Sequence, residues 1–381
     1  MINKSTQYSE TFFIVAGEKS ADNHGAVLMQ AIRTLNPKAQ FVGIGGKKML
    51  KVGLKSLEKI ERLSIMGFIE VIKHLSFFHK LMKKILEEIK FIQPIQIILI
   101  DYPGFNLRLA KKIKNHFNIP ITYYISPQLW AWKEGRIEII RKYIDQMLVI
   151  FPFEERWYKE RGIKASFVGH PIFDEWSLTS KDNLCSDLKL NCNELIITLY
   201  PGSRKQELDR HLPLFIKSAE VLKNKWPNIQ FILGLANELK LNNHTVPDWI
   251  MIENDNPIKA LECADFAFVA SGSATLEAAI FNTPMIIVYK MNQLSWYISR
   301  LFIKVDYAGM VNIIADEKIM PEYIQEKATV KAITNEAIEI ISDRNKREEM
   351  KSKLLCIKEK LKGDGASMKA AEKILSLIHS K

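Results

Sequence analysis

Short runs of apolar residues alternate along the whole chain with longer segments in which apolar residues recur every three or four positions. This alternation predicts parallel β-strands connected by α-helices. Because the runs are apolar without interruption, we expect both faces of each strand to be covered. The expected strands form two series, residues 12–15, 41–44, 95–100, 121–125 and 147–151, followed by residues 195–199, 231–233, 266–269 and 285–289.

Two series of strands in a chain of 381 residues predict two Rossmann-like α/β domains. The polar stretch 176–193 lies between the two series and is the expected linker. We assign residues 1–175 to an N-terminal domain and residues 185–345 to a C-terminal domain. After Ala332 the pattern is helical, and we expect the helices of residues 346–381 to pack back across the domains.

Two carboxylates that follow strands are the candidate catalytic residues, because ligands bind beyond the carboxyl ends of parallel strands. Asp101 follows the apolar run 95–100, where a carboxylate is costly to desolvate unless it is paired or transfers protons. We interpret Asp101 as a general base; helix capping is the alternative, but Asn106 can supply a cap. Glu18 follows the first run, and its alternative is an ordinary solvated loop residue.

Two turns in the second series join a strand to a helix through small residues, which favours an anion such as a nucleotide diphosphate. An arginine in such a turn can contact a phosphate through two hydrogen bonds. Glu277, one turn into the second helix, can accept hydrogen bonds from both ribose hydroxyls. Each feature alone is also typical of an ordinary surface residue. The turns contain Gly202, Ser203 and Arg204, and Ser271, Gly272 and Ser273.

The composition of the chain and the spacing of its motifs limit the kinds of partner, cofactor and metal site that we expect. The chain has 54 Lys and Arg against 43 Asp and Glu, and this net charge of +11 favours an anionic partner, although a lysine-rich surface without a partner is equally compatible. The four cysteines show no paired spacing, so we expect no disulfide and a reducing compartment. We find no G-x-G-x-x-G, no Walker A loop and no metal-ligand spacing, and we expect neither a cofactor nor a metal.

Eight sequence blocks, taken together, resemble the lipid-A-disaccharide synthase family, a group of inverting glycosyltransferases. That family has the GT-B fold, in which two Rossmann-like domains face a cleft. The blocks are A-G-E-x-S-x-D (16–22), I-M-G-F-I-E-V (65–71), I-D-Y-P-G-F-N (100–106), Y-Y-I-S-P-Q-L-W-A-W (123–132), F-P-F-E (151–154), F-V-G-H-P (167–171), P-G-S-R-x-x-E (201–207) and A-S-G-S-A-T-L-E (270–277).

The resemblance implies an enzyme that joins UDP-2,3-diacylglucosamine to 2,3-diacylglucosamine 1-phosphate through a β-1,6 link and releases UDP, in lipid A biosynthesis. It implies an acceptor-binding N-terminal domain with Asp101 as the base, and a UDP-binding C-terminal domain. Arg204, Glu277 and Asn312 match positions that contact UDP. On the acceptor side, the matching residues are Glu18, Ser20 and Gln128.

Two departures from the family pattern bear on these assignments. The chain reads Ser20-Ala21-Asp22 where the family has S-G-D, and alanine adopts positive φ less readily than glycine. It reads Met310-Val311-Asn312 where the family has a proline before the asparagine. The first departure bears on the geometry of the acceptor loop, and the second on the assignment of Asn312.

An apolar cluster beside several lysines predicts contact with an anionic membrane surface; a core helix with a solvated edge is the alternative. The first residues lack an apolar signal segment, and no run is long enough to span a bilayer. We therefore expect a cytoplasmic protein, peripheral on the inner face of the inner membrane, and the resemblance suggests a homodimer. The cluster consists of Met66, Phe68, Ile69, Ile72, Leu75, Phe77 and Phe78.

Three other functions remain open at this point. A different UDP-sugar enzyme of the same fold, such as an epimerase or a transferase for cell-wall precursors, would bind UDP without requiring acyl chains. A nucleic-acid-binding protein would agree with the charge, but the sequence contains no RNP-like, helix-turn-helix or zinc-finger pattern. An inactive relative that acts as a membrane scaffold would agree with the two departures.

Overall fold

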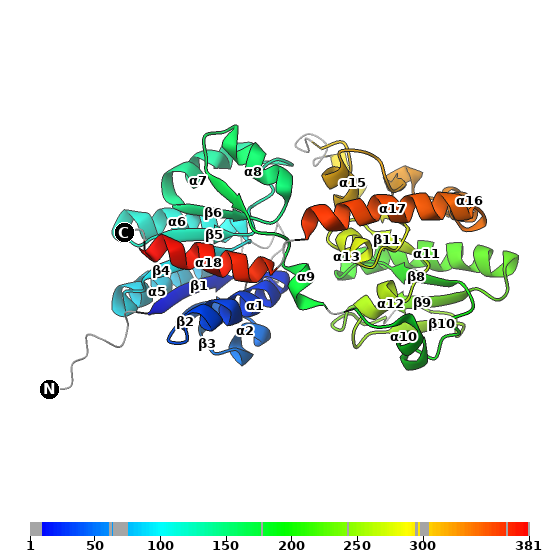
Figure 1. Cartoon of the computed structure of the whole chain (residues 1–381), viewed down its shortest axis with the longest axis horizontal. Helices are drawn as coiled ribbons and strands as arrows, with labels where there is room; N and C mark the ends of the chain where they lie inside the picture. Colours follow the sequence, from blue (N-terminus) through cyan, green and yellow to red (C-terminus); the bar gives the residue numbers. More distant parts are fainter. Residues whose placement is uncertain are drawn as a thin grey trace. The chain divides into compact units, whose positions relative to one another are not determined.

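The computed structural model describes residues 10–60, 63, 75–176, 178–241, 244–293, 296–297, 305–362 and 365–379. The chain forms two compact units (Figure 1). Unit 1 comprises the residues up to Trp176 together with those from Leu361 onwards, and unit 2 comprises Ser177–Lys360. The last helix thus belongs to the unit that contains the start of the chain.

Unit 1 is built on a seven-stranded parallel sheet with the order β3-β2-β1-β4-β5-β6-β7. The register pairs Phe12 with Phe41 on one side of β1 and with Gln96 on the other. These central strands are fully buried, as their uninterrupted apolar runs predict. The strands are β1 Thr11–Ala16, β2 Gln40–Gly45, β3 Leu54–Lys59, β4 Gln96–Ile100, β5 Ile121–Tyr124, β6 Gln146–Val149 and β7 Ala165–Phe167.

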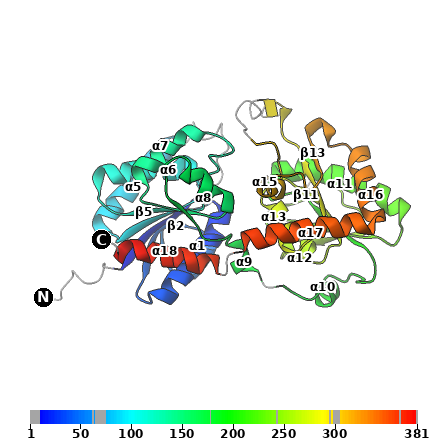
Figure 2. The same cartoon turned by 45° about the horizontal axis from the view of Figure 1, so that its top comes forward.

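Helices cover both faces of this sheet. The buried residues of α5, α6 and α7 form one apolar core with the strands. On α1, eight buried residues form one face, and α18 lies beside α1 in both views (Figures 1 and 2). The helices are α1 Lys19–Leu35, α2 Lys47–Lys51, α5 Leu75–Ile92, α6 Pro103–His116, α7 Ile137–Tyr143, α8 Pro152–Lys159, α9 Ile172–Glu175 and α18 Ala366–His379, with the 3-10 helix η1 at Glu134–Arg136.

The start of α18 is held by Asp174, which lies in α9. The Asp174 carboxylate accepts hydrogen bonds from the amides of Ala366 and Ser367, at 3.1 and 2.6 Å. These amides have no partner within their own helix, so the carboxylate caps it. Fully buried Ala370 and Ile374 then continue the apolar face of α18. The chain therefore returns to unit 1 through a specific cap as well as through packing.

Unit 2 contains a six-stranded parallel sheet with the order β10-β9-β8-β11-β12-β13. Its strands are β8 Ile196–Tyr200, β9 Gln230–Gly234, β10 Ile250–Glu253, β11 Phe266–Ala270, β12 Met285–Tyr289 and β13 Glu322–Ile324. Its helices are α10 Lys181–Asp187, α11 Lys205–Lys225, α12 Ile258–Glu262, α13 Ala274–Ile280, α15 Met310–Ala315, α16 Val330–Ser342 and α17 Arg344–Leu361, with the 3-10 helix η2 at Gln325–Lys327.

Part of the stretch that we expected to be a linker is folded into unit 2. Helix α10 buries Leu184 and Cys185 in a small apolar cluster, and Leu188, the residue that follows the helix, belongs to the same cluster. Their spacing is that of one face of a helix. We overlooked this spacing because the stretch as a whole is polar. The change of unit falls at Trp176 and Ser177, at the start of the expected linker.

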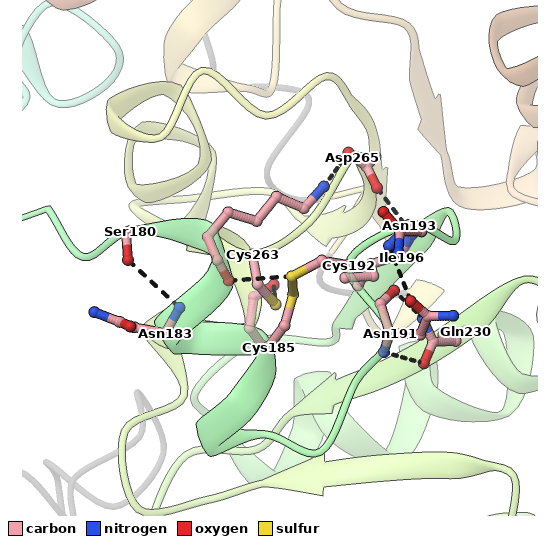
Figure 3. Close-up of a disulfide and its surroundings, with 12 residues drawn as sticks. Ser180, Asn183, Cys185, Asn191, Cys192, Asn193, Ile196, Gln230, Cys263 and Asp265 are labelled. Atoms are coloured by element: carbon pink, nitrogen blue, oxygen red, sulfur yellow. Dashed lines mark hydrogen bonds and ion pairs between the residues drawn. A yellow bond between two sulfur atoms is a disulfide. The ribbon is translucent and has the colours of Figure 1, made fainter.

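Cys185 and Cys192 form a disulfide with a Cα–Cα distance of 5.8 Å (Figure 3). Our expectation of no disulfide is therefore wrong. The chain reverses after α10 because Lys189 adopts a left-handed conformation, with φ of 53°, and the Leu190 amide donates to the Cys185 carbonyl oxygen at 2.8 Å. This turn brings Cys192 back beside the helix. The spacing of the two cysteines matches no motif from which the disulfide could be predicted.

Candidate active site

Asp101 lies at the turn between β4 and α6, at the carboxyl edge of the first sheet. Asp101 and Tyr102 both adopt left-handed conformations, with φ of 44° and 49°. Two side chains donate to the Asp101 carbonyl oxygen, the Tyr123 hydroxyl at 2.5 Å and the Asn106 amide at 2.8 Å. Left-handed non-glycine residues are costly and persist only where neighbours fix them. These bonds therefore fix the backbone that carries the Asp101 carboxylate.

The half-buried Asp101 carboxylate lies near a second carboxylate, that of Glu18. Strands β1 and β4 are neighbours, so the turns that follow them share one edge of the sheet. The pKa of Asp101 is raised from its ordinary value of 3.8 to about 6, mainly by burial and then by the charge of Glu18, while the Tyr102 amide and His24 lower it. Such a group is ionised at neutral pH but basic enough to accept a proton.

Asp22, in the same motif as Glu18, holds the neighbouring loop. It is 5% exposed, and its carboxylate accepts hydrogen bonds from the amides of Gly46, Lys48 and Met49 at 2.7, 3.0 and 3.0 Å. These amides belong to the start of α2, where a helix leaves its first N–H groups without partners. The end of the motif thus has a structural role that sequence reasoning did not assign.

Gly17 and Ala21, two small residues that follow β1, differ in whether their positions require glycine. Ala21 lies within α1, and its φ is not positive. The departure from glycine therefore demands no unusual backbone, and alanine is favourable inside a helix. Gly17 is the position without room, since a Cβ there would lie 2.2 Å from the Tyr102 ring. Our concern about the acceptor loop therefore does not apply to Ala21.

Ser20 and Gln128, the other residues expected on the acceptor side, are both exposed. Ser20 lies in the first turn of α1, which follows β1, and Gln128 lies in the loop that follows β5. Strands β1 and β5 flank β4 in the sheet. Both residues therefore lie at the edge that carries Asp101.

Glu154 fixes the loop that contains Gln128. This fully buried carboxylate accepts hydrogen bonds from the Ser126 hydroxyl at 2.6 Å, the Trp130 indole at 3.0 Å and the Phe151 amide at 3.1 Å. Burial raises its pKa to about 7, although these bonds lower it. The F-P-F-E and S-P-Q-L-W segments are thus one structural unit, which their separation in the sequence conceals.

In unit 2, Gly202, Ser203 and Arg204 form the turn between β8 and α11. Glu207 accepts hydrogen bonds from the Ser203 and Arg204 amides, at 3.1 and 3.2 Å, and a Cβ on Gly202 would lie 2.4 Å from the same carboxylate. Glu207 thus caps the start of α11 through these two amides, and the contact of Gly202, Ser203 and Arg204 with UDP stays a prediction. The Arg204 side chain is 76% exposed and lies 3.6 Å from Glu207.

The second turn, which contains Ser271, Gly272 and Ser273, joins β11 to α13. Gly272 has a φ of 127°, and no atom lies within 4 Å of the place that a Cβ would take. In the described part of the chain, the Gly272 and Ser273 amides donate no hydrogen bond. Among the described residues, the Gly272 and Ser273 amides are therefore available to a ligand, whereas the Ser203 and Arg204 amides of the first turn are bonded to Glu207.

Glu277 is positioned by a residue that sequence reasoning missed. The Tyr200 hydroxyl, at the end of β8, donates to the Glu277 carboxylate at 2.8 Å. Burial and the charge of Glu277 raise the pKa of Tyr200 well above its ordinary value, so the hydroxyl remains a donor. The two residues are 77 positions apart, and no motif links them.

Asn312 is fully buried, and its amide is engaged within unit 2. The amide group donates to the Met320 carbonyl oxygen at 2.8 Å and to Glu322 at 2.7 Å, and its oxygen accepts from the Met320 amide at 2.9 Å. Glu322 also accepts from the Ala308 and Gly309 amides, at 2.9 and 2.8 Å. The structure thus gives Asn312 a positioning role, and its contact with UDP stays a prediction.

The apolar cluster expected at a membrane is only partly visible. Phe77 and Phe78 are partly buried and pack against the core of unit 1, and the Phe78 ring lies 5.8 Å from that of Phe105. No helix in the described ranges is long and apolar enough to cross a bilayer. Those ranges also contain no group of three or more His, Cys, Asp or Glu that could hold a metal ion. Outside the described residues lie Met66, Phe68, Ile69, Ile72 and the side chain of Leu75.

Solved structures similar to this chain confirm the expected fold class. A UDP-GlcNAc 2-epimerase from Neisseria meningitidis has a TM-score of 0.66 at 12% identity, covering 96% of this chain and 100% of its own. The spinosyn rhamnosyltransferase SpnG has a TM-score of 0.63 at 8% identity, with the same coverage. At such low identity the likeness concerns the fold alone, which epimerases and glycosyltransferases share.

Sequence relatives identify the family. The lipid-A-disaccharide synthase of Trichlorobacter lovleyi is 37% identical over 378 residues, covering 96% of this chain and 97% of the relative. That of Coxiella burnetii strain CbuK_Q154 is 33% identical and covers 98% and 100%. The family model for lipid-A-disaccharide synthetase matches residues 12–377. The resemblance drawn from the sequence blocks is thus confirmed, and the chain belongs to the lipid-A-disaccharide synthetase family.

Proposed function

We propose that the protein transfers 2,3-diacylglucosamine from UDP to 2,3-diacylglucosamine 1-phosphate, forming the β-1,6-linked lipid A disaccharide 1-phosphate and UDP. Membership of the family supports this activity. The observation that carries the mechanism is the Asp101 carboxylate, which a strained turn presents at the carboxyl edge of the sheet with a pKa of about 6.

Asp101 acts as the general base. Its carboxylate removes the proton from the acceptor 6-hydroxyl while that oxygen forms a bond to the anomeric carbon of the donor. The bond from this carbon to the UDP oxygen breaks, and UDP leaves with the electron pair from the opposite face of the sugar. Glu18 acts through Asp101, because its charge helps to keep Asp101 basic. Ser20 and Gln128 position the acceptor.

Unit 2 holds the UDP. The exposed Arg204 side chain contacts the diphosphate, together with the amides of Gly272 and Ser273, which donate to no other group in the described ranges. Glu277, held by Tyr200, accepts hydrogen bonds from the ribose hydroxyls. Donors fixed before the reaction stabilise the charge that develops on the departing UDP.

The protein acts at the cytoplasmic face of an anionic membrane, as a peripheral protein and as a homodimer. The net charge of +11 supports the membrane part of the proposal, because acylated substrates reside in a bilayer and basic proteins are attracted to anionic lipids. Sedimentation with vesicles of anionic phospholipid tests the association, and binding to neutral vesicles at the same strength would contradict it. Analytical ultracentrifugation measures the oligomeric state.

The direct test is incubation with both acylated substrates, followed by mass spectrometry for the disaccharide. A parallel reaction with unacylated UDP-GlcNAc separates this function from an epimerase or a cell-wall transferase. Asp101→Asn should abolish product formation. Asp145→Asn is the matched control, since Asp145 accepts a hydrogen bond from the amide of Ile121, the first residue of β5, and so lies at the other end of the strands from Asp101. Equal loss in both variants, or disaccharide formation by Asp101→Asn at the wild-type rate, would reject the base.

A further inference from the structure

Three basic side chains, Arg108, Lys133 and Arg136, form a cationic cluster at the edge of unit 1 that carries Asp101. Arg108 lies in the second turn of α6, which follows β4, and the other two lie at η1, in the segment that follows β5. Strands β4 and β5 are neighbours, and α6 packs against α7, which follows η1 directly. The fold thus brings together three cations from two adjacent connections.

The two arginines have no acidic partner in the described part of the chain. The nearest carboxylate in the sequence, Glu134, accepts a hydrogen bond from Arg161 at 2.8 Å. Glu138, the next one, pairs with Arg141. Three other arginines of this unit do have acidic partners: Arg141 pairs with Glu138, Arg156 with Glu160 and Arg161 with Glu134. Arg108 and Arg136 thus differ from Arg141, Arg156 and Arg161.

The cations of the cluster repel one another. Burial, and then repulsion by Arg136 and Arg108, lowers the pKa of Lys133. Burial and repulsion by Arg108 likewise lower the pKa of Arg136. A bound dianion would relieve this repulsion, and arginine matches the geometry of phosphate oxygens. Among the described residues, the two arginines therefore lack a carboxylate that would balance their charge.

Tyr123 links the cluster to the catalytic turn. Its hydroxyl donates to the Asp101 carbonyl oxygen at 2.5 Å. The pKa of Tyr123 is raised, first by burial and then by Asp101, and it is lowered by Arg136. Asp101 and Arg136 therefore both lie close enough to influence one phenol.

We propose that Arg108, Lys133 and Arg136 form a subsite for the phosphate monoester of the acceptor. This proposal rests on the proposed function, which supplies an acceptor with a 1-phosphate and a hydroxyl that must reach Asp101. A phosphate held beside the base would orient the acceptor sugar. The subsite would also select the phosphorylated sugar over its dephosphorylated form.

Steady-state kinetics with two acceptors test the subsite. Arg136→Gln and Arg108→Gln should each raise KM for 2,3-diacylglucosamine 1-phosphate about 10- to 100-fold, the worth of a charge-assisted hydrogen bond to phosphate, and leave KM for the UDP donor unchanged. With 2,3-diacylglucosamine that lacks the phosphate, wild type and variants should have the same, already high KM. Arg136→Lys should recover part of the loss. Arg156→Gln is the matched control.

Two outcomes would overturn the subsite. One is an equal loss with both acceptors, since the missing contact then is not to the phosphate. The other is weaker binding of the variants to anionic vesicles with an unchanged dependence on the acceptor phosphate, because the cluster then binds lipid headgroups. If wild type forms no disaccharide at all, the proposed function fails first. Melting temperatures equal to that of wild type verify that the variants are folded.

Discussion

Replacing Asp101 by asparagine should remove activity and stabilise the protein at the same time. The pKa of Asp101 is about 6 in the folded chain and 3.8 ordinarily, so ionisation is less favourable in the folded state than in the unfolded one. The stabilising contribution of this group is complete below pH 3.8 and is lost as the pH rises through 6. A difference of about two pKa units corresponds to a loss of about 2 to 3 kcal/mol in the free energy of unfolding when Asp101 ionises. Asparagine stays neutral, so the variant keeps this stability as the pH rises.

Urea unfolding at pH 4 and pH 8 measures this difference. Asp101→Asn should differ little from wild type at pH 4 and should be about 2 to 3 kcal/mol more stable at pH 8. Asp145→Asn should show the opposite sign at pH 8, because Asp145 pairs with Lys114 at 2.6 Å and caps Ile121 at 2.7 Å. If Asp101→Asn is no more stable than wild type at pH 8, the carboxylate is not held at an energetic cost and our reasoning on its pKa fails.

Three further results are expected. The rate parameter kcat/KM should fall about tenfold per pH unit below pH 6, because the base must be ionised, and a profile that stays flat to pH 5 would exclude Asp101 as the base. Asp22→Ala should lower the free energy of unfolding by about 2 to 4 kcal/mol, measured in urea, because three amides of the α2 turn lose their acceptor. Tyr200→Phe should raise KM for the UDP donor about 3- to 30-fold without affecting KM for the acceptor, and an unchanged donor KM would contradict the role of Glu277.

The sequence predicted the inner strands of both sheets and none of the outer ones. The four strands that it missed, β3, β7, β10 and β13, are the edge strands of the two sheets. An inner strand of a parallel sheet is covered on both faces and is therefore apolar throughout, as in Gln96–Ile100. An edge strand is partly exposed and carries polar residues, as in Leu54–Lys59. A rule based on continuous apolar runs detects the first kind and cannot detect the second.

The candidate site, too, contains residues that the sequence could place and residues that it could not. Residues that follow a strand, such as Glu18 and Asp101, could be placed at one edge because strand topology fixes where the turns lie. The partners that shape these residues come from distant segments, as Tyr200 does for Glu277 and Tyr123 for Asp101. Such pairs depend on strand order, which a single sequence does not reveal.

The acidic residues of the motifs divide by what their oxygen atoms contact. Asp22 and Glu207 accept hydrogen bonds from backbone amides at the start of a helix, and Glu154 accepts from a hydroxyl, an indole and an amide. A carboxylate that accepts several such bonds holds a loop in place, even where burial raises its pKa as it does for Glu154. For half-buried Asp101, burial and the charge of Glu18 raise the pKa, and among the described residues the Tyr102 amide is the only hydrogen-bond donor that lowers it. The number of donors that a carboxylate accepts from, rather than a raised pKa, therefore separates the acids that hold loops from the candidate base, and an acid that follows an apolar strand is a candidate for either role until those donors are known.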